Sequence, residues 1–182
     1  GLVVIHDGVV SGDQYAWCKS ILGGAWRWQA PDLPKDKATK WLEGDVGLCW
    51  LDTEHPITRG VSNFDWKDEI YYDLDFAPDI GVLAASFHNV HIIAPQVWTY
   101  EKQLAGGTTP YRAFVSLPGH EYDVFNTPQY RTVLLRGIAW AGKRANADEF
   151  CTPEELASLR YPPGGPLPAK EAMKTFALHP EF

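Results

Sequence analysis

Short apolar runs separated by polar corners organise most of this 182-residue chain. The first run, at residues 2–5, contains four consecutive apolar residues, which predicts a strand buried on both faces, as in a parallel sheet. The run at 70–76 alternates apolar and polar side chains, so we expect it to be a half-buried strand. Other strand-like runs occupy residues 46–51, 80–87, 96–100 and 112–117.

The first strand leads directly into a predicted helix. Ser11 and Gln14 have the spacing of a capping box, which predicts a helix over about residues 12–22. In open α/β sheets, the corner at the carboxyl end of a parallel strand is where sites are placed. His6 lies at this corner. We expect it to belong to a site, with the alternative that it only satisfies a local carbonyl group.

The later part of the chain repeats this arrangement. Residues 25–44 are polar and contain two prolines and three tryptophans, so we expect a long loop with a functional role. The last clear strand, at 112–117, also ends at a glycine-bearing corner, and this corner carries His120. A helix with Pro128 at its first position follows, and a capping box opens a short helix at Thr152.

These patterns predict one domain and an extension. We expect the domain at residues 1–144, a short helical extension at 145–160 and a Pro/Gly-rich linker at 161–182. A central parallel strand needs neighbours on both sides. The opening strand therefore predicts at least one βα unit upstream in a longer polypeptide.

Composition excludes some classes of function. The net charge is −7 with no basic run, which argues against nucleic-acid binding. No apolar run approaches the length of a membrane span. The three cysteines have neither a zinc-site spacing nor an even disulfide count, so they leave the cellular compartment open.

The ordered motifs resemble the ThuA-like (trehalose-utilisation) family. The resemblance runs from residue 1 to about residue 144 through motifs at residues 4–6, 55–61, 68–71, 95–101, 112–115, 119–120 and 138–142. It implies the flavodoxin-like layout of class I glutamine-amidotransferase domains, an α/β fold with a parallel sheet and helices on both faces. The N-terminal βα units of that layout would be missing here.

One departure from the amidotransferases decides against their reaction. Their first corner carries a nucleophilic cysteine, and a later strand end carries a histidine. Here His6 occupies the first position and His120 resembles the second, while Glu121 follows at the wrong spacing for the acidic partner. Without a thiolate nucleophile we do not expect glutamine hydrolysis.

Residues 151–182 also resemble a junction found in large bacterial proteins. There a ThuA-like domain precedes a propeller-type dehydrogenase and a haem-binding module. This resemblance implies that parts of a larger chain lie upstream and downstream. It also implies that the protein is exported or periplasmic.

Our first hypothesis is an enzyme that acts on a sugar or a 3-keto-sugar. In the implied fold, His6, His120 and residues 68–71 converge on one pocket. Two imidazoles and a carboxylate exchange protons near neutral pH, which suits isomerisation, elimination or hydrolysis beside a carbonyl. We assign His6 and His120 as acid/base groups, Glu69 as an orienting group or second base, and Tyr71 as a hydroxyl donor. The alternative for the acidic pair at 68–69 is a solvated strand start.

A small-molecule carbohydrate is the expected partner, and the same pocket supplies its binding residues. Trp98 and a tryptophan of residues 25–44 offer flat faces for a sugar, with the alternative that Trp98 is a core aromatic. The full set of expected substrate-binding residues is Asp7, Trp98, Tyr100, Arg112 and Glu121.

Two other hypotheses stay open. A divalent metal such as zinc fits His6 and His120 with Glu69 or Glu121 as ligands, and it would indicate a metal-dependent hydrolase. Alternatively, the domain is a non-catalytic carbohydrate-binding or docking module for the downstream dehydrogenase. The oligomeric state is open, an oligomer included.

Overall fold

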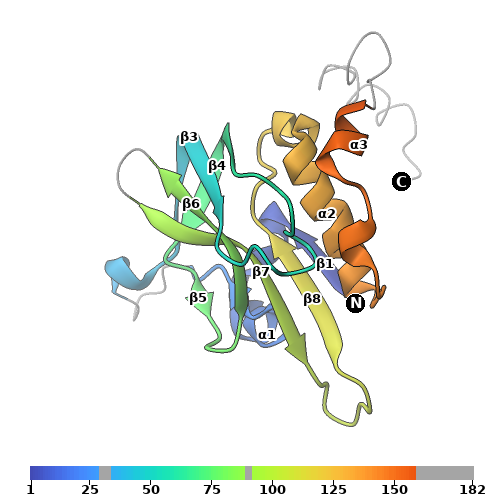
Figure 1. Ribbon diagram of the computed structural model, residues 1–182. Helices are drawn as coiled ribbons and strands as arrows, with labels where there is room; N and C mark the ends of the chain where they lie inside the picture. Colours follow the sequence, from blue (N-terminus) through green and yellow to red (C-terminus); the bar gives the residue numbers. More distant parts are fainter. Residues whose placement is uncertain (29–33, 89–91, 159–182) are drawn as a thin grey trace, which may run out of the picture.

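The computed structural model describes residues 1–28, 34–88 and 92–158. Its main sheet has six strands in the order β1-β8-β7-β6-β3-β4, and a two-stranded sheet pairs β2 with β5 (Figure 1). The main strands are β1 (Leu2–Ile5), β3 (Lys40–Trp50), β4 (Phe64–Tyr72), β6 (Gly81–His88), β7 (Ile93–Lys102) and β8 (Tyr111–Ser116). The small strands and the helices are β2 (Gly24–Ala25), β5 (Asp75–Phe76), α1 (Tyr15–Leu22), α2 (Pro128–Ala141) and α3 (Pro153–Ser158). Among the described residues, no helix has both the length and the apolar character needed to cross a membrane.

The strand directions correct part of the predicted fold. The mixed α/β class is confirmed, but in the main sheet only the β1–β8 pair is parallel, with Leu2 opposite Ala113 and Ile5 opposite Ser116. The other neighbouring strands pair antiparallel. The connections at 89–92 and 103–110 are too short for the crossover that a parallel pair requires.

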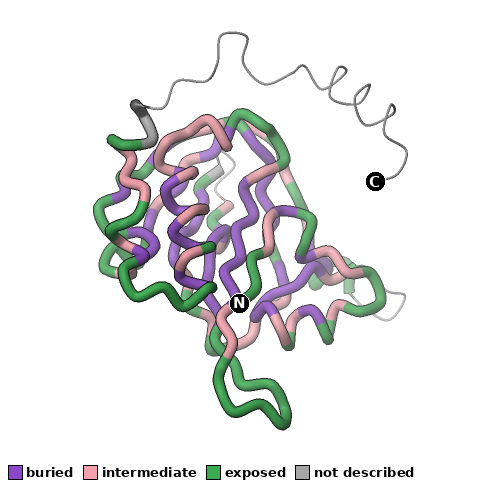
Figure 2. Tube along the Cα trace, turned by 90° about the vertical axis from the view of Figure 1, so that its right-hand side faces the viewer, coloured by how far each residue is buried: buried purple, intermediate pink, exposed green. Residues whose placement is uncertain are grey.

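Helices cover both faces of the β1–β8–β7 region. Phe114 of β8 faces the core cluster that contains Val133 and Trp140 of α2, whereas its neighbour Val115 faces the cluster that contains Leu22 of α1. The tube in Figure 2 shows how this buried part contrasts with the exposed β7–β8 loop. The predicted layering of helix, sheet and helix therefore exists in this region, because side chains of a strand alternate between its faces.

Several local predictions differ from the structure. The first strand is not buried on both faces, since Leu2 and Val3 are 39% and 37% exposed. β3 begins at Lys40, inside the predicted loop at 25–44. The alternation predicted for 70–76 also fails. Residues 68–71 are all buried, and the backbone turns at Asp73 with a φ of 58°.

The helix starts show one wrong and one correct capping prediction. The Ser11 side chain makes no capping hydrogen bond, and residues 12–14 form a 3-10 turn ahead of α1. The Thr152 box is confirmed, since Glu155 N donates to Thr152 Oγ1 and Thr152 N donates to Glu155 Oε2. The Pro128 helix is also confirmed, over Pro128–Ala141.

The sheet curls so that its two edges approach one another. β1 and β4 are the outermost strands in the sheet order, yet they meet on one side of the molecule. Gln96 of β7 is fully buried and donates through Nε2 to the Tyr71 carbonyl of β4 at 2.7 Å. His6, directly after β1, lies against the Tyr71 ring, with ring centroids 5.0 Å apart. This curl brings β4 to the carboxyl ends of the parallel pair.

The C-terminal extension packs against α2. Ala147, in the 3-10 turn Ala147–Glu149, belongs to the same core cluster as α2 residues. Arg136 of α2 is 3% exposed and donates to the carbonyls of Arg59 and Phe150. The predicted linker at 161–182 lies outside the described residues.

Candidate functional site

Three chain segments build the site. The corner after β1 supplies His6 and Asp7, β4 supplies Glu69 and Tyr71, and the turn after β8 supplies His120. The parallel pairing of β1 and β8 places both histidine-bearing corners at one end of the sheet. The curl then brings β4 to them. The structure thus brings together all four residues assigned to the predicted catalytic group.

His6 is held in an unusual backbone conformation. It is 8% exposed and has a φ of +47°, in the left-handed region that side-chain-bearing residues rarely adopt. It begins the 3-10 turn His6–Val9. Such conformations cost about 1–3 kcal/mol and concentrate at functional sites. This conformation directs the imidazole of His6 toward Glu69.

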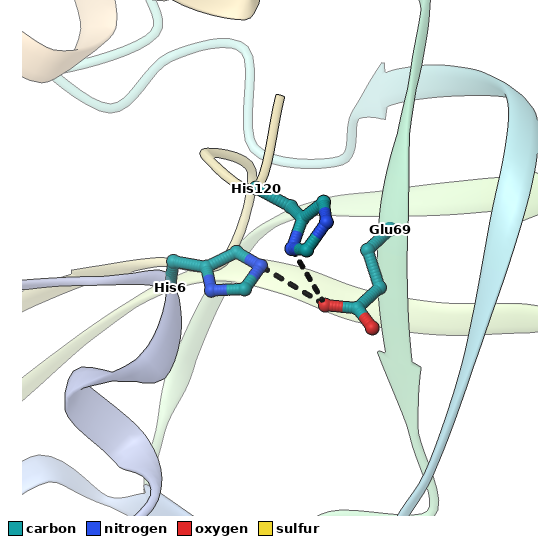
Figure 3. A group of neighbouring side chains, drawn as sticks. All are labelled: His6, Glu69 and His120. Atoms are coloured by element: carbon teal, nitrogen blue, oxygen red, sulfur yellow. Dashed lines mark ion pairs between the residues drawn. The ribbon is translucent and has the colours of Figure 1, made fainter. Parts of the chain in front are cut away.

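Glu69 joins the two imidazoles into what we call the imidazole–carboxylate cluster, composed of His6, Glu69 and His120. Glu69 Oε2 lies 3.2 Å from His6 Nε2 and 3.4 Å from His120 Nδ1. The two imidazole rings have centroids 5.3 Å apart. Figure 3 shows both rings directed at the same carboxylate oxygen. One oxygen can therefore exchange a proton with either ring.

Tyr71 and Asp7 complete the surroundings of His6. Tyr71 Oη donates to Asp7 Oδ1 at 2.6 Å, and that carboxylate oxygen also lies 3.1 Å from His6 Nδ1. The hydrogen bond from Tyr71 lowers the pKa of Asp7. Burial, followed by the bond to Asp7, raises the pKa of Tyr71. Tyr71 therefore stays a hydroxyl donor at neutral pH, and Asp7 stays a carboxylate.

The turn that carries His120 is fixed from two sides. The Asp68 carboxylate on β4 accepts hydrogen bonds from the backbone N–H groups of Gly119 and Glu121. From α2, Tyr130 Oη donates to the Pro118 carbonyl at 2.6 Å. Backbone hydrogen bonds on both sides restrict the turn, so the His120 ring has a defined approach to Glu69.

A cavity of about 500 Å³ opens beside the cluster. One side is formed by what we call the aromatic wall, composed of Trp26, Trp28 and Trp41. Trp26 packs edge-on against Tyr71 with ring centroids 4.8 Å apart, and Trp28 lies 5.7 Å from Trp26. The other residues that line the cavity are Asp7, Val10, Glu69, Tyr71 and His120.

The two imidazoles relate differently to this cavity. His120 lines it, and its side chain is 43% exposed. The His6 side chain is only 10% exposed and is not in the lining, although it contacts Glu69, which is. A ligand in the cavity would therefore meet His120 and Glu69 directly, while His6 would act through Glu69.

The donor atoms of the cluster also fit a metal ion. His6 Nε2, Glu69 Oε2 and His120 Nδ1 all lie within 4.8 Å of one another. Two ligands bound tetrahedrally to zinc at about 2.0–2.1 Å are about 3.3 Å apart. The two contacts of Glu69 Oε2, at 3.2 and 3.4 Å, match this separation. Two histidines and one carboxylate also form a ligand set that leaves a coordination position open.

Three expected substrate-binding residues lie elsewhere. Trp98 is fully buried and donates through Nε1 to the Leu22 carbonyl at 2.7 Å, so its core alternative is correct. Tyr100 is 4% exposed in the same core cluster. Arg112 stacks on Trp140 of α2 and pairs with Glu101. Because none of the three lines the cavity, we remove them from the proposed site.

Asp7 and Glu121 had also been expected to bind substrate. Asp7 lines the cavity, with a side chain that is 80% exposed. Glu121 is exposed and lines a separate hollow with Trp66 and Lys67. Its backbone N–H, rather than its carboxylate, is tied to the site through Asp68. The metal-binding alternative with Glu121 is therefore disfavoured relative to Glu69.

Sequence reasoning missed Glu43 and left the role of Asp68 open. Asp68 is 1% exposed, so the solvated alternative for residues 68–69 is wrong. Glu43 of β3 is the register partner of Glu69, and its Oε1 lies 3.8 Å from His120 Nε2. The pairing of β3 with β4 would have indicated Glu43, but that pairing was hidden because β3 begins inside the predicted loop.

Comparisons with known proteins agree with the fold and identify the family. The sequence model of the family described as ThuA, trehalose utilisation, matches residues 1–141. A ThuA-like protein from Parabacteroides merdae ATCC 43184 superposes with a TM-score of 0.60 at 17% identity, over 90% of this chain and 63% of that one. A ThuA-like protein from Bacteroides uniformis ATCC 8492 superposes with a TM-score of 0.54 at 18% identity, over 78% of this chain and 58% of that one.

These likenesses have different weight. At such identities the two structures show a shared fold alone, and this chain spans less than two-thirds of the length of either. A search among curated proteins found no match. The family match, by contrast, covers well over half of the 182 residues. The chain therefore belongs to the ThuA family, whose description is trehalose utilisation.

Proposed function

We propose that this domain processes a carbohydrate, with the imidazole–carboxylate cluster performing acid–base chemistry on a sugar or a 3-keto-sugar. One observation carries the proposal: Glu69 and His120 line the same cavity as the aromatic wall. Sugars have flat apolar faces and polar edges, and they suit an aromatic surface set against hydrogen-bonding groups. The family description gives the same direction.

In this proposal His120 exchanges a proton with the substrate. Its Nδ1 faces Glu69, and its ring lies in the lining of the cavity. Glu69 orients the ring and accepts or returns the proton, and His6 supports Glu69 through the 3.2 Å contact between Nε2 and Oε2. Tyr71 keeps its proton and orients Asp7. A positioned acid–base group of this kind contributes about 10²–10⁴-fold to a rate.

The deciding experiment is a panel of disaccharides and their 3-keto derivatives, assayed for turnover and, separately, for binding. We expect at least one to be turned over by the wild-type protein and not by His120→Ala. Trp17→Ala is a matched control, because Trp17 is 64% exposed on α1 and does not line the cavity. If no compound is turned over, or if His120→Ala keeps the activity, the acid–base proposal is wrong.

A metal-dependent hydrolase is a second candidate, favoured by the ligand-like spacing around Glu69 Oε2. A bound zinc ion would supply an activated water or polarise a carbonyl. Metal analysis of the purified protein tests this version. We expect near-stoichiometric metal that is lost in His120→Ala. Metal-free protein that is folded and active would contradict it.

A non-catalytic carbohydrate-binding module is the third candidate. The observation that favours it is the exposure of Trp28 and Trp41, each 53% exposed in the lining of the cavity. It predicts binding in the panel without turnover, and binding that survives His120→Ala. We also retain as proposals the 1–144 domain boundary, a downstream dehydrogenase partner and export.

A further inference from the structure

We propose that Asp68 is a positioning residue: its buried carboxylate holds the turn that carries His120 against β4 and so sets the distance between His120 and Glu69. This inference rests on the proposed function, because it concerns the geometry of the same cluster. Asp68 does not line the cavity, so this role is separate from the one proposed for its neighbour Glu69.

The hydrogen bonds of Asp68 divide evenly between its own strand and the turn. Oδ1 accepts from Glu69 N at 2.7 Å and from Glu121 N at 3.0 Å. Oδ2 accepts from Trp66 Nε1 at 2.9 Å and from Gly119 N at 2.9 Å. Each oxygen therefore links β4 to the turn, and the two N–H groups from the turn belong to the residues that flank His120.

Burial makes these links strong. Asp68 is 1% exposed, so water does not compete for its oxygens. Hydrogen bonds to an ionised carboxylate are about twice as strong as those between neutral groups. A carboxylate has about four lone-pair sites, and four N–H donors fill them. A neutral side chain of the same shape does not reproduce this set of contacts.

The other side of the turn limits how it can move. Gly119 has a φ of +144°, and a Cβ at this position would lie 3.1 Å from Ile5 Cγ2 and 3.6 Å from His6 Cβ. The turn is therefore pressed between the β1 corner and β4. The packing limits the turn on the β1 side, and the bonds to Asp68 hold it on the β4 side. When those bonds are removed, we expect the turn to move away from Glu69.

The distance at stake is the 3.4 Å between His120 Nδ1 and Glu69 Oε2. A misplacement of about 1 Å in a catalytic group can cost about 10²-fold in rate. Groups that orient the ligands of a metal ion are worth about 10–100-fold in affinity or activity. The positioning role is therefore measurable whether the cluster works with a metal or without one.

The test is Asp68→Asn, read out by turnover and by the imidazole nitrogen resonances in NMR. Asparagine keeps the shape but replaces one acceptor oxygen with an NH₂ group, which faces two N–H donors. We expect a folded protein whose turnover falls about 10–100-fold. We also expect the Nδ1 resonance of His120 to shift, because the turn that carries His120 is displaced from Glu69. The resonances of His55, which packs on Trp140 away from the cluster, stay unchanged.

Two control variants separate positioning from plain stabilisation. Trp66→Phe deletes one donor to Asp68 but leaves both bonds to the turn. We expect it to lower the unfolding temperature while the His120 resonance and turnover stay as in the wild type. Asp65→Asn changes an exposed acid on the same strand, and it should alter neither the His120 resonance nor the turnover. If Trp66→Phe shifts His120 as much as Asp68→Asn does, the positioning role is wrong.

A second variant covers the case in which Asp68→Asn does not fold. Gly119→Ala places a Cβ against Ile5 at a strained φ and so disturbs the hydrogen bond from Gly119 N to Asp68 Oδ2, while the Asp68 carboxylate is kept. We expect it to shift the His120 resonance in the same way. An unchanged His120 resonance in the variant that folds overturns the inference. The NMR result is independent of turnover. An absence of turnover in the wild type with the expected shifts would therefore contradict the proposed function and leave the positioning role standing.

Discussion

The imidazole–carboxylate cluster and the aromatic wall face the same cavity, but the fold holds them in different ways. The side chains of His6 and Glu69 are 10% and 9% exposed and lie within a set of polar contacts. Trp28 and Trp41 in the wall are each 53% exposed. Buried polar contacts fix a geometry, whereas exposed aromatic surface adapts to a ligand. Under the proposed function, the cluster would perform the chemistry and the wall would bind the ligand.

Glu69→Gln is the variant that should affect the cluster most. It removes the negative charge and the proton-accepting carboxylate that both imidazoles share, while the cavity keeps its shape. We expect turnover to fall about 10²–10⁴-fold, with ligand affinity nearly unchanged, as measured by steady-state kinetics and calorimetry. Glu43→Gln is the matched control, because its carboxylate is 58% exposed and lies 3.8 Å from His120 Nε2. An equal loss in both variants would contradict the special position of Glu69.

Trp98→Ala tests a tryptophan that belongs to neither region. Its side chain is fully buried between the sheet and α1, and removing an aromatic side chain from a core costs about 3–5 kcal/mol of folding free energy. Denaturant unfolding measures this loss. Weakened ligand binding at full stability would instead return Trp98 to the substrate site.

Trp41→Ala should have the opposite profile. Its ring is half exposed in the wall, so we expect little change in stability. A stacking contact worth about 0.5–1.5 kcal/mol corresponds to about a 2- to 12-fold loss of affinity, at unchanged turnover number. Calorimetric titration with the ligand from the panel measures it, and Trp17→Ala serves as the control. A loss of turnover number without a loss of affinity would break the division between capture and chemistry.

Tyr71→Phe should have the smallest effect, a loss of folding stability that depends on pH. The bond from Tyr71 lowers the pKa of Asp7 in the folded state. The stabilisation is therefore present above the unfolded-state value of about 3.9 and is lost as the pH falls through the folded-state value. Because the Asp7 side chain is 80% exposed, water screens it, and we expect less than about 1 kcal/mol.

Comparison of the unfolding free energies of wild type and Tyr71→Phe at pH 7 and near pH 3 tests this expectation. The difference between the two proteins should shrink in acid. A difference that grows as the pH falls would show that the Asp7 contact is not its source.

The parts of the fold that the sequence predicts well have strong local signals. The helix at Pro128–Ala141 begins with proline and carries a regular apolar stripe, and β8 is a short apolar run. β3 was missed at its start, because residues 40–45 are mostly polar or glycine. The antiparallel order of β7, β6, β3 and β4 depends on long-range pairing, which no local pattern encodes.

The site residues divide in the same way into those with a local sequence signal and those that depend on the tertiary fold. His6 and His120 were predictable because each ends an apolar strand at a glycine-bearing corner, and Glu69 and Tyr71 followed from the family motif. Asp68 belonged to the same predicted segment, but its burial could not be decided, since an acidic pair at a strand start looks solvated until the curled sheet covers it. Trp98 looked like a ligand-binding residue because a lone tryptophan on a strand gives no signal of which layer will bury it.

The left-handed backbone at His6 means that its replacement changes two things at once. At a φ of +47°, alanine would remove the imidazole and keep the unfavourable dihedral angle, whereas glycine would remove both. Asparagine tolerates this region better than most residues. Comparing the three variants would separate the chemical contribution of the ring from the conformational cost of its position. This corner is where we expect a trade-off between thermal robustness and activity in this protein.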